Sequence, residues 1–241
     1  VNKRGSITLR ELKNELDISE STARRDIVTL DKLGKLEKVF GGAISLKEEV
    51  STFEPTVAQK ASLYTEEKNT IAEYASSLIE ASDVVFIDSG TTTLALANYI
   101  PSAEDVIFVT NGIVHAQILA AKGNRVMLIG GMLKNATEAV IGSTAVLMAQ
   151  QFNFTKGFFG VNGINRRLGL TTPEYEEASF KQEAMKHCKQ CYVLADSSKF
   201  DVTTSVTFGN GKAVKIITDR IPEGYEDYEN IIIQAKACKD F

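Results

Sequence analysis

Residues 19–30 read SESTARRDIVTL, and this stretch is the starting point from which the rest of the fold can be inferred. At about 100° per residue, the side chains of Ala23, Ile27 and Leu30 fall close together on one face of a helix. Ser19, directly before the helix, has a side chain suited to an N-cap. The stretch therefore predicts a short amphipathic helix with two adjacent arginines.

A second helix is predicted just upstream, in TLRELKNEL from Thr8 to Leu16. Thr8 and Glu11 have the spacing of a capping box, and three leucines recur at helical spacing. Only two residues, 17–18, separate the two predicted helices. Two short helices joined by so tight a turn indicate a helix-turn-helix, whose second helix can enter the major groove of DNA.

The same pattern is also compatible with an ordinary helical hairpin whose arginines lie on a solvated face. The residues that follow favour the first interpretation. Gly34 is placed to end the second helix as a left-handed C-cap, and LEKVFGGAIS (36–45) alternates around Gly41-Gly42 as a hairpin does. Two helices followed by a hairpin predict a winged helix-turn-helix.

The helical wheel and the wing suggest how this domain would contact DNA. The first 48 residues carry ten Lys and Arg against eight Asp and Glu, whereas the whole chain has a net charge of −4, so the basic groups are local. The residues expected to face base edges are Ser21, Thr22 and Arg25, and those expected beside the phosphates are Arg24, Lys35, Lys38, Gly41 and Gly42.

Composition is typical of a cytoplasmic protein with a substantial core. The 241 residues are 44% hydrophobic, yet no apolar run approaches the roughly 18 residues of a membrane span, and no signal-peptide pattern is present. Three cysteines give no disulfide framework. His187-Cys188 and Cys191 lack a second ligand pair, so we expect no metal site.

A different pattern begins after the wing. We expect residues 1–46 to form the DNA-binding domain, the polar segment 47–67 a linker, and residues 68–241 a second domain. Apolar runs separated mostly by helix-like segments predict a doubly wound α/β domain with a parallel sheet. These runs are VVFID (84–88), VIFVT (106–110), RVMLIG (125–130), GFFGV (157–161), CYVLAD (191–196), KIITD (215–219) and, as a possible last strand, IIIQA (231–235).

Ligands of such sheets bind outside the carboxyl ends of the strands, and here these ends are rich in glycine and hydroxyl groups. The segments are DSGTTT (88–93), TNG (110–112), GG (130–131), NG (162–163) and DSSK (196–199). Gly90 would let backbone N–H groups approach an anion at a helix N-terminus, and Lys199 would add a positive charge. Because neither a P-loop nor a GxGxxG motif is present, we expect a phosphate with a polyhydroxylated tail rather than a nucleotide.

The run SESTARRDIVTLDKLGKLEKVFGGA (19–43) resembles the DNA-binding signature of the DeoR family of bacterial transcription regulators. FIDSGTTTLALA, VTNG, IGG, GVNGI and LADSSKF extend the resemblance over essentially the whole chain. It implies a C-terminal domain similar in fold to ribose-5-phosphate isomerase, which binds phosphorylated sugars as inducers. It also implies a further helix before Val1, so that the chain would be N-terminally incomplete.

Motif by motif, the resemblance assigns the effector pocket. It implies that the phosphate is held by Asp88, Gly90, Thr91, Thr92 and Thr93, and that Asn111, Asn162, Glu174 and Lys199 line the remainder. The strand-end pattern adds Ser89, Gly130 and Gly131 to this predicted site.

Two other functions remain open at this stage. A sugar-phosphate isomerase with an accessory helical module would need a general base, but GVNGIN offers Asn162 and Asn165 where the isomerase segment is rich in Asp. His115 and His187 lie on helix-like stretches, and we assign no catalytic residue. An α/β domain that serves only to oligomerise would not need glycines and hydroxyls at five strand ends.

The sequence thus predicts a repressor of a sugar-metabolism operon with operator DNA and a sugar phosphate as partners. We expect a homo-oligomer, dimer or tetramer, because one short recognition helix contacts too few bases for high specificity. No cofactor, metal or membrane contact is expected.

Overall fold

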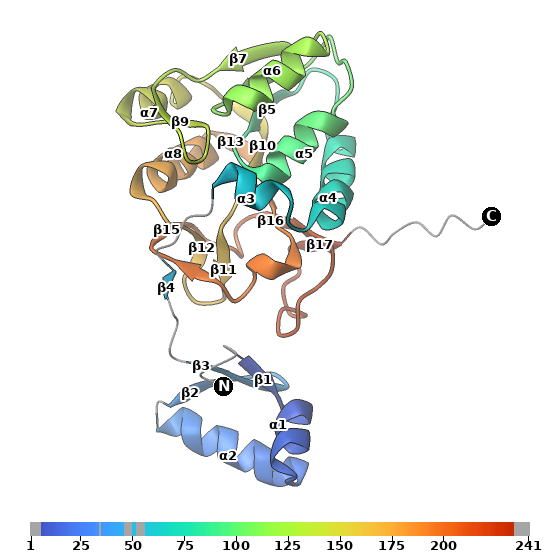
Figure 1. Cartoon of the computed structure of the whole chain (residues 1–241), viewed down its shortest axis with the longest axis vertical. Helices are drawn as coiled ribbons and strands as arrows, with labels where there is room; N and C mark the ends of the chain where they lie inside the picture. Colours follow the sequence, from blue (N-terminus) through green and yellow to red (C-terminus); the bar gives the residue numbers. More distant parts are fainter. Residues whose placement is uncertain (1–5, 34, 46–49, 52–55, 234–241) are drawn as a thin grey trace, which may run out of the picture. The chain divides into compact units, whose positions relative to one another are not determined.

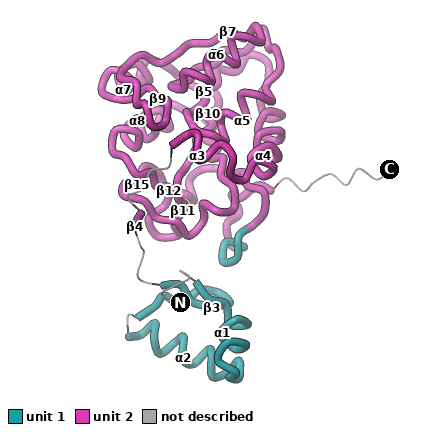
Figure 2. The backbone as a smooth tube through the Cα atoms, viewed as in Figure 1, with its two compact units in different colours: residues 1–50, 222–227 teal, residues 51–221, 228–241 magenta. Residues whose placement is uncertain are grey.

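The computed structural model describes residues 6–33, 35–45, 50–51 and 56–233. The chain divides into two compact units (Figure 2). The N-terminal unit comprises Val1–Val50 with Pro222–Asp227, and the C-terminal unit comprises Ser51–Ile221 with Tyr228–Phe241. Each unit is described by itself.

The N-terminal unit contains two helices and a three-stranded antiparallel sheet with strand order β1-β3-β2 (Figure 1). A small apolar core of Ile7, Ile27, Leu36 and Ala43 joins the helices to the sheet. The elements are β1 (Ser6–Thr8), α1 (Leu9–Leu16), α2 (Glu20–Lys32), β2 (Leu36–Val39) and β3 (Gly42–Ser45). The predicted winged helix-turn-helix is confirmed.

Both helices begin as their sequences predict. Thr8 and Glu11 form the complete capping box of α1, and the Ser19 side chain accepts a hydrogen bond from the Thr22 N–H at the start of α2. Ala23 and Ile27 are buried, whereas Leu30, expected on the same face, is 39% exposed. The C-cap expected at Gly34 lies outside the described residues.

The hairpin differs from the prediction by one residue. Its turn is Phe40-Gly41, since Gly42 already belongs to β3 and pairs with Thr8 of β1. A Cβ atom on Gly42 would lie 2.2 Å from the carbonyl oxygen of Ile7, so only glycine lets these strands approach so closely. The strand β1 was not expected, because three residues are too short to show a period.

The C-terminal unit is built on a seven-stranded parallel sheet, and the predicted α/β fold with a central parallel sheet is confirmed (Figure 1). Every predicted apolar run contributes a strand to it. In spatial order the strands are β17 (Ile231–Ile233), β16 (Lys215–Thr218), β13 (Cys188–Leu194), β10 (Phe154–Gly160), β5 (Val84–Ile87), β6 (Ile107–Thr110) and β7 (Arg125–Leu128).

Helices cover both faces of this sheet. One face packs a large apolar cluster, including Phe108, Phe158 and Leu96, under α4 and α5, and the other packs Phe86 against Phe180 of α8. The helices are α4 (Thr65–Ser77), α5 (Thr91–Tyr99), α6 (Ile113–Ala121), α7 (Ser143–Ala149) and α8 (Tyr175–Lys186), with a 3₁₀ turn at Ser197–Lys199.

Short strands complete the unit beside the main sheet. They are β8 (Met132–Lys134) with β9 (Ala139–Ile141), then β11 (Gly163–Asn165), β12 (Gly169–Thr172) and β15 (Val206–Gly209), and finally β14 (Thr203–Thr204) with β4 (Val50–Ser51).

The described part of the segment expected as a linker is partly helical. It contains α3 (Val57–Ala61) and the first residues of α4. Thr56 and Gln59 form a complete capping box for α3, a local signal that outweighs the polar composition of the segment.

The strand order places the ligand crevice. The chain runs from β5 outward to β7, and then returns to β10 on the other side of β5 and runs outward to β17. This reversal between β5 and β10 is a topological switch point, where the loops after two neighbouring strands diverge and leave room for a ligand.

Candidate functional site

The exposed face of α2 carries the side chains that the sequence assigns to DNA. Ser21, Thr22, Arg24 and Arg25 are all exposed. The Arg24 guanidinium is 2.6 Å from the Glu20 carboxylate, one helical turn away. Among the described residues, nothing pairs with the Arg25 side chain, which leaves its guanidinium available for a ligand.

The hairpin presents two exposed lysines and an exposed aromatic ring. Lys35 and Lys38 are exposed, and the backbone N–H of Lys38 donates to Asp31 at 2.9 Å, which ties β2 to α2. Phe40 at the tip is 100% exposed, and Gly41 beside it has φ +86°. Phe40 was not singled out from the sequence. A phenyl ring held fully in water at a wing tip is suited to contact an apolar surface or a DNA groove.

In the C-terminal unit a cavity of about 230 Å³ lies at the switch point. The loop after β5 contributes Ser89, Gly90, Thr91 and Thr92 to its wall, and the segment after β10 contributes Gly160 to Asn162. The opposing wall comes from α3, α4 and α8, which lie far apart in the sequence.

The loop after β5 is held open toward the cavity by residues behind it. Gly90, with φ +155°, is the N-cap residue of α5, so the free N–H groups and the positive end of that helix lie at the loop. The Ser89 N–H donates to Asn111 Oδ1 at 2.9 Å. Thr93 Oγ1 and His115 Nε2 each donate to the Gly90 carbonyl oxygen at 3.1 Å.

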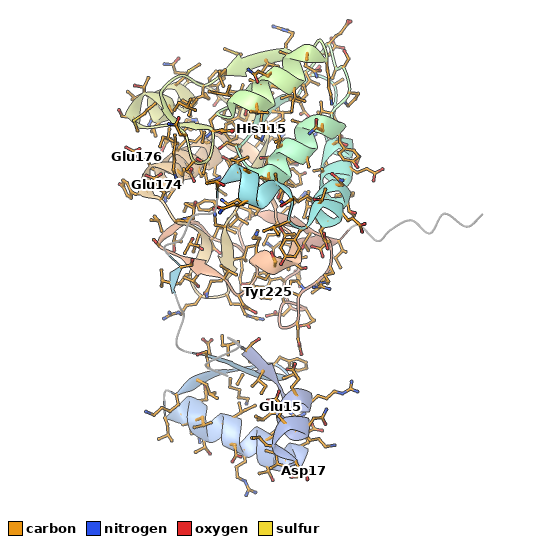
Figure 3. The ribbon with its side chains drawn as sticks, viewed as in Figure 1. Glu15, Asp17, His115, Glu174, Glu176 and Tyr225 are labelled. Carbon is orange, nitrogen blue, oxygen red and sulfur yellow. The ribbon has the colours of Figure 1, made fainter. Side chains whose placement is uncertain are left out.

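His115 of α6 (Figure 3) is buried, and its ring contacts the Gly90 carbonyl of this loop. Burial lowers the pKa of its imidazole to about 4, an effect that outweighs the hydrogen bond to Gly90. The ring is therefore uncharged near neutral pH, with Nε2 carrying the proton that it donates. Its role is structural: it fixes the backbone of the loop.

Asp88 and Lys181 form a buried ion pair behind the cavity. Asp88 Oδ2 also accepts the Gly160 N–H at 2.9 Å, which joins the loops after β5 and β10. Burial raises the pKa of the Asp88 carboxyl, and Lys181 acts against that rise. Because Lys181 also lines the cavity, this pair connects the sheet ends to any ligand bound there.

Four lysines from four different segments line the cavity: Lys60, Lys68, Lys181 and Lys199. Lys68 is only 5% exposed, and its Nζ donates to the Lys60 carbonyl oxygen at 2.5 Å. Burial lowers the pKa of Lys68, and the nearby Lys199 and Lys60 lower it further against the opposing effect of Asp196. The mutual repulsion of these ammonium groups destabilises the folded protein, and a bound anion would relieve it.

Glu177 supplies the negative side of the cavity wall. It is 7% exposed and accepts hydrogen bonds from Thr137 Oγ1 at 2.6 Å and Lys134 Nζ at 3.2 Å. Burial would raise the pKa of Glu177, but Lys181, Thr137 and Lys134 together hold it below its usual range. An ionised carboxylate here can accept hydrogen bonds from ligand hydroxyl groups.

The structure brings half of the predicted ligand site to the cavity, namely Ser89, Gly90, Thr91, Thr92, Asn162 and Lys199. Asp88, Thr93 and Asn111 lie one layer behind and support these residues.

Three predicted residues lie elsewhere. The Gly130 N–H donates to the Met148 sulfur, and Gly131 packs against Ile141, because β7 is two strands away from the switch point. Glu174 caps α8 through the Glu177 N–H at 3.0 Å (Figure 3).

Sequence reasoning missed the groups that face the loop, among them Lys60, Lys68, Glu177 and Lys181. One signal was available: Glu177 and Lys181 lie one helical turn apart on α8, so they share a face that is otherwise apolar.

Two family profiles cover most of the chain. The profile described as "DeoR-like helix-turn-helix domain" matches residues 1–49, and "DeoR C terminal sensor domain" matches residues 64–220. The chain belongs to the DeoR family. It is therefore a transcription regulator with a DNA-binding winged helix and a sensor domain, and not an enzyme.

Curated proteins similar to this DeoR-family chain carry regulator names. One is "Uncharacterized HTH-type transcriptional regulator FruR" of Bacillus subtilis (strain 168), 39% identical over 95% of this chain and 91% of that protein. Another is a "Lactose phosphotransferase system repressor" of Staphylococcus epidermidis (strain ATCC 12228 / FDA PCI 1200), 37% identical over 83% of this chain and 79% of that protein.

Among solved structures, ribose 5-phosphate isomerase A of Methanocaldococcus jannaschii is similar with a TM-score of 0.41 and 11% identity. It covers 56% of this DeoR-family chain, and the chain covers 54% of it. A likeness of this size carries no argument about function.

No described helix is both long and apolar enough to span a bilayer. Within the same residues, no three side chains of His, Cys, Asp or Glu gather as they would around a metal ion.

Proposed function

We propose that this DeoR-family chain is a DNA-binding repressor of a sugar-metabolism operon, controlled by a phosphorylated sugar in the switch-point cavity. The similarity of 83% of this chain to a lactose phosphotransferase system repressor supports the sugar-operon part of the proposal. The cavity supports the effector part.

The observation that carries the effector assignment is the charge of the cavity wall. Lys60, Lys68, Lys181 and Lys199 surround a space that also faces the N-terminus of α5. A phosphate dianion there would receive charge-assisted hydrogen bonds from ammonium groups and from the first N–H groups of the helix.

The size and the remaining polar groups favour a small sugar as the rest of the ligand. The volume of about 230 Å³ is below the roughly 300–1,000 Å³ of drug-sized sites, which suits a phosphorylated monosaccharide better than a dinucleotide. Asn162, Thr137 and Glu177 can exchange hydrogen bonds with sugar hydroxyls. Thr204, also in the wall, has a buried hydroxyl without a partner among the described residues.

The same cavity offers a route to regulation. Val57 and Lys60 of α3, and Leu63 and Tyr64 just after it, belong to the cavity wall but to no buried core. A ligand would contact this segment directly and stabilise one of its arrangements. Since the segment follows the DNA-binding domain in the chain, effector binding would bias the positions open to the recognition helix.

For DNA we propose the roles that the wheel predicts. Ser21, Thr22 and Arg25 would read base edges, while Arg24, Lys35, Lys38 and Gly41 would lie beside the phosphates. Gly42, predicted among the phosphate-facing residues, is buried in β3 against β1 and is left out of this proposal. In this proposal residues 1–46 bind DNA and the C-terminal domain provides effector binding and homo-oligomerisation.

A thermal-shift panel tests the effector assignment. We would use fructose-1-phosphate, tagatose-6-phosphate, deoxyribose-5-phosphate and glycerol-3-phosphate, with each free sugar or glycerol as control. Ligand at 100 times Kd stabilises the folded state by about 2.7 kcal/mol, which corresponds to a rise in Tm of about 5–10 °C. We expect at least one phosphorylated member to give such a rise and its free counterpart to give none.

The matched variants are Lys68→Met and Lys122→Met. Both lysines have their pKa lowered by burial and donate to backbone carbonyls, but only Lys68 lines the cavity. Lys68→Met should lose the shift and Lys122→Met should keep it. Equal responses of the two variants, or no response of the wild type to any member of a wider sugar-phosphate panel, would refute the assignment.

A further inference from the structure

The strand β7 forms an edge of the seven-stranded sheet, and three of its four residues are exposed. Within the described residues it pairs only with β6, and Figure 1 shows it at the border of the fold with no element beyond it. Met127 is 43% and Leu128 42% exposed. The unpaired N–H and C=O groups of an exposed strand edge can pair with another strand.

The backbone of β7 has groups free to pair outward. The Ile129 N–H donates to the Thr110 carbonyl of β6 at 2.9 Å. Backbone groups alternate in direction along a strand, so the N–H and C=O groups of Arg125 and Met127 also point toward β6. Val126 and Leu128 therefore point their N–H and C=O groups away from the sheet. The next outward N–H, that of Gly130, donates to the Met148 sulfur at 3.2 Å, which ends the open edge.

Further exposed apolar side chains follow β7 in the chain. They are Met132 at 57%, Leu133 at 46% and Leu147 at 61% exposure. From Arg125 to Gln150 only three of the 26 residues are charged, although 24% of the whole chain is. A sparsely charged segment with several exposed apolar side chains, directly after an open strand edge in the chain, marks an interaction surface.

We propose that this surface binds a second copy of the same chain, with the two β7 strands pairing antiparallel about a two-fold axis through Met127. Val126 would then exchange hydrogen bonds with Leu128 of the partner subunit, and the reverse pair would form across the axis. The two parallel sheets would join into one continuous sheet.

The charges of the strand fit this arrangement. Arg125 is the one charged residue of β7, and in the proposed register it lies opposite Ile129 of the partner subunit rather than opposite its own copy. The strand thus pairs with itself without bringing like charges together. An isologous interface also supplies two recognition helices, which a DNA-binding protein with one short helix per chain requires.

The first experiment measures the mass of the full chain in solution, by light scattering after size exclusion, for wild type and two lysine variants. Met127→Lys would place two lysines directly opposite each other at the axis, with Cβ atoms about 4.5–5.5 Å apart, and like charges in such a pair are destabilising. Ile233→Lys is the matched control, since Ile233 is 40% exposed on β17, the opposite edge of the same sheet. We expect Met127→Lys to halve the mass of the wild type and Ile233→Lys to leave it unchanged.

A mixing experiment separates a broken interface from a misfolded variant. Met127→Lys and Met127→Glu, each of half mass alone, should regain the wild-type mass when mixed, because unlike charges then meet at the axis. A Met127→Cys variant should form a covalent dimer on oxidation that neither wild type nor Ile233→Cys forms, since paired strands bring Cα atoms within disulfide reach.

A monomeric wild type, an unchanged mass of Met127→Lys, or loss of the dimer in Ile233→Lys instead would overturn the proposal. These measurements need neither ligand nor DNA, so their failure is distinguishable from failure of the proposed effector.

Discussion

Replacing His115 by glutamine should remove a pH dependence from the stability of the C-terminal unit. His115 lies 5% exposed beneath the loop after β5, where its Nε2–H donates to the Gly90 carbonyl at 3.1 Å. Burial, helped by the charge of Lys181 and opposed by the hydrogen bond to Gly90, lowers the pKa of the imidazole from 6.5 to about 4. A glutamine amide can donate to the same carbonyl but does not titrate.

The sign and size follow from the two pKa values. Because the pKa is depressed in the folded state, the unfolded chain takes up the proton first, so stability is intact above about pH 6.5 and falls as the pH drops toward the folded-state pKa. Between pH 7 and pH 5 these values correspond to a loss of about 2 kcal/mol. For a unit of this size, the loss lowers Tm by about 4–8 °C.

The assay compares thermal unfolding of wild type and His115→Gln at pH 7 and pH 5. Other titrating groups act on both proteins, so the difference between their two pH responses isolates His115. We expect the variant to lose about 2 kcal/mol less than wild type between the two pH values. Equal losses in both proteins would show that His115 is not held neutral and would refute the account of this loop.

Three further substitutions test separate parts of the structure. Arg25→Ala should weaken binding to a selected DNA site by about 1–3 kcal/mol and relax the base preference of the protein. Fluorescence anisotropy on the selected site and its single-base variants measures both effects. A uniform loss of affinity on all sites would assign Arg25 to the phosphates instead. Gly42→Ala should destabilise the N-terminal unit by about 1–3 kcal/mol in urea unfolding, since its Cβ would lie 2.2 Å from the Ile7 carbonyl oxygen; unchanged stability would count against that close strand pairing. Lys181→Met should lower the free energy of unfolding by about 3–5 kcal/mol, because it leaves Asp88 buried without its cation. Adding Asp88→Asn should recover much of this loss in the same urea unfolding assay. A double variant no more stable than Lys181→Met would contradict the role given to this ion pair.

Local patterns were enough to predict most of the fold. These patterns reflect interactions between residues that lie close together in the sequence. They are the helical spacing of Ala23 and Ile27, the capping box at Thr8, and the seven apolar runs. The spatial order of the strands was not contained in those patterns, since it depends on packing between distant segments. Without the strand order, no sequence pattern separates Gly130 and Gly131 from the site. The structure shows that their strand, β7, ends away from the switch point.

The residues of the candidate site also differ in whether a local sequence pattern predicts them. Ser89 to Thr92 form one contiguous motif, which the sequence predicts and which lines the cavity. Lys60, Lys68 and Lys181 come from three helices, and each alone looks like an ordinary surface lysine. Only the tertiary structure shows that these side chains face one cavity.

We propose that a phosphorylated sugar in this cavity controls DNA binding. The most direct test of this proposal is the anisotropy of a labelled DNA duplex, selected by the chain itself from a random pool, during titration with the phosphorylated sugar that raises Tm. We expect wild-type DNA affinity to fall by about 5- to 150-fold, the free sugar to have no effect, and Lys68→Met to bind the same DNA without responding. An unchanged affinity of the wild type, or a full response of Lys68→Met, would contradict the proposal.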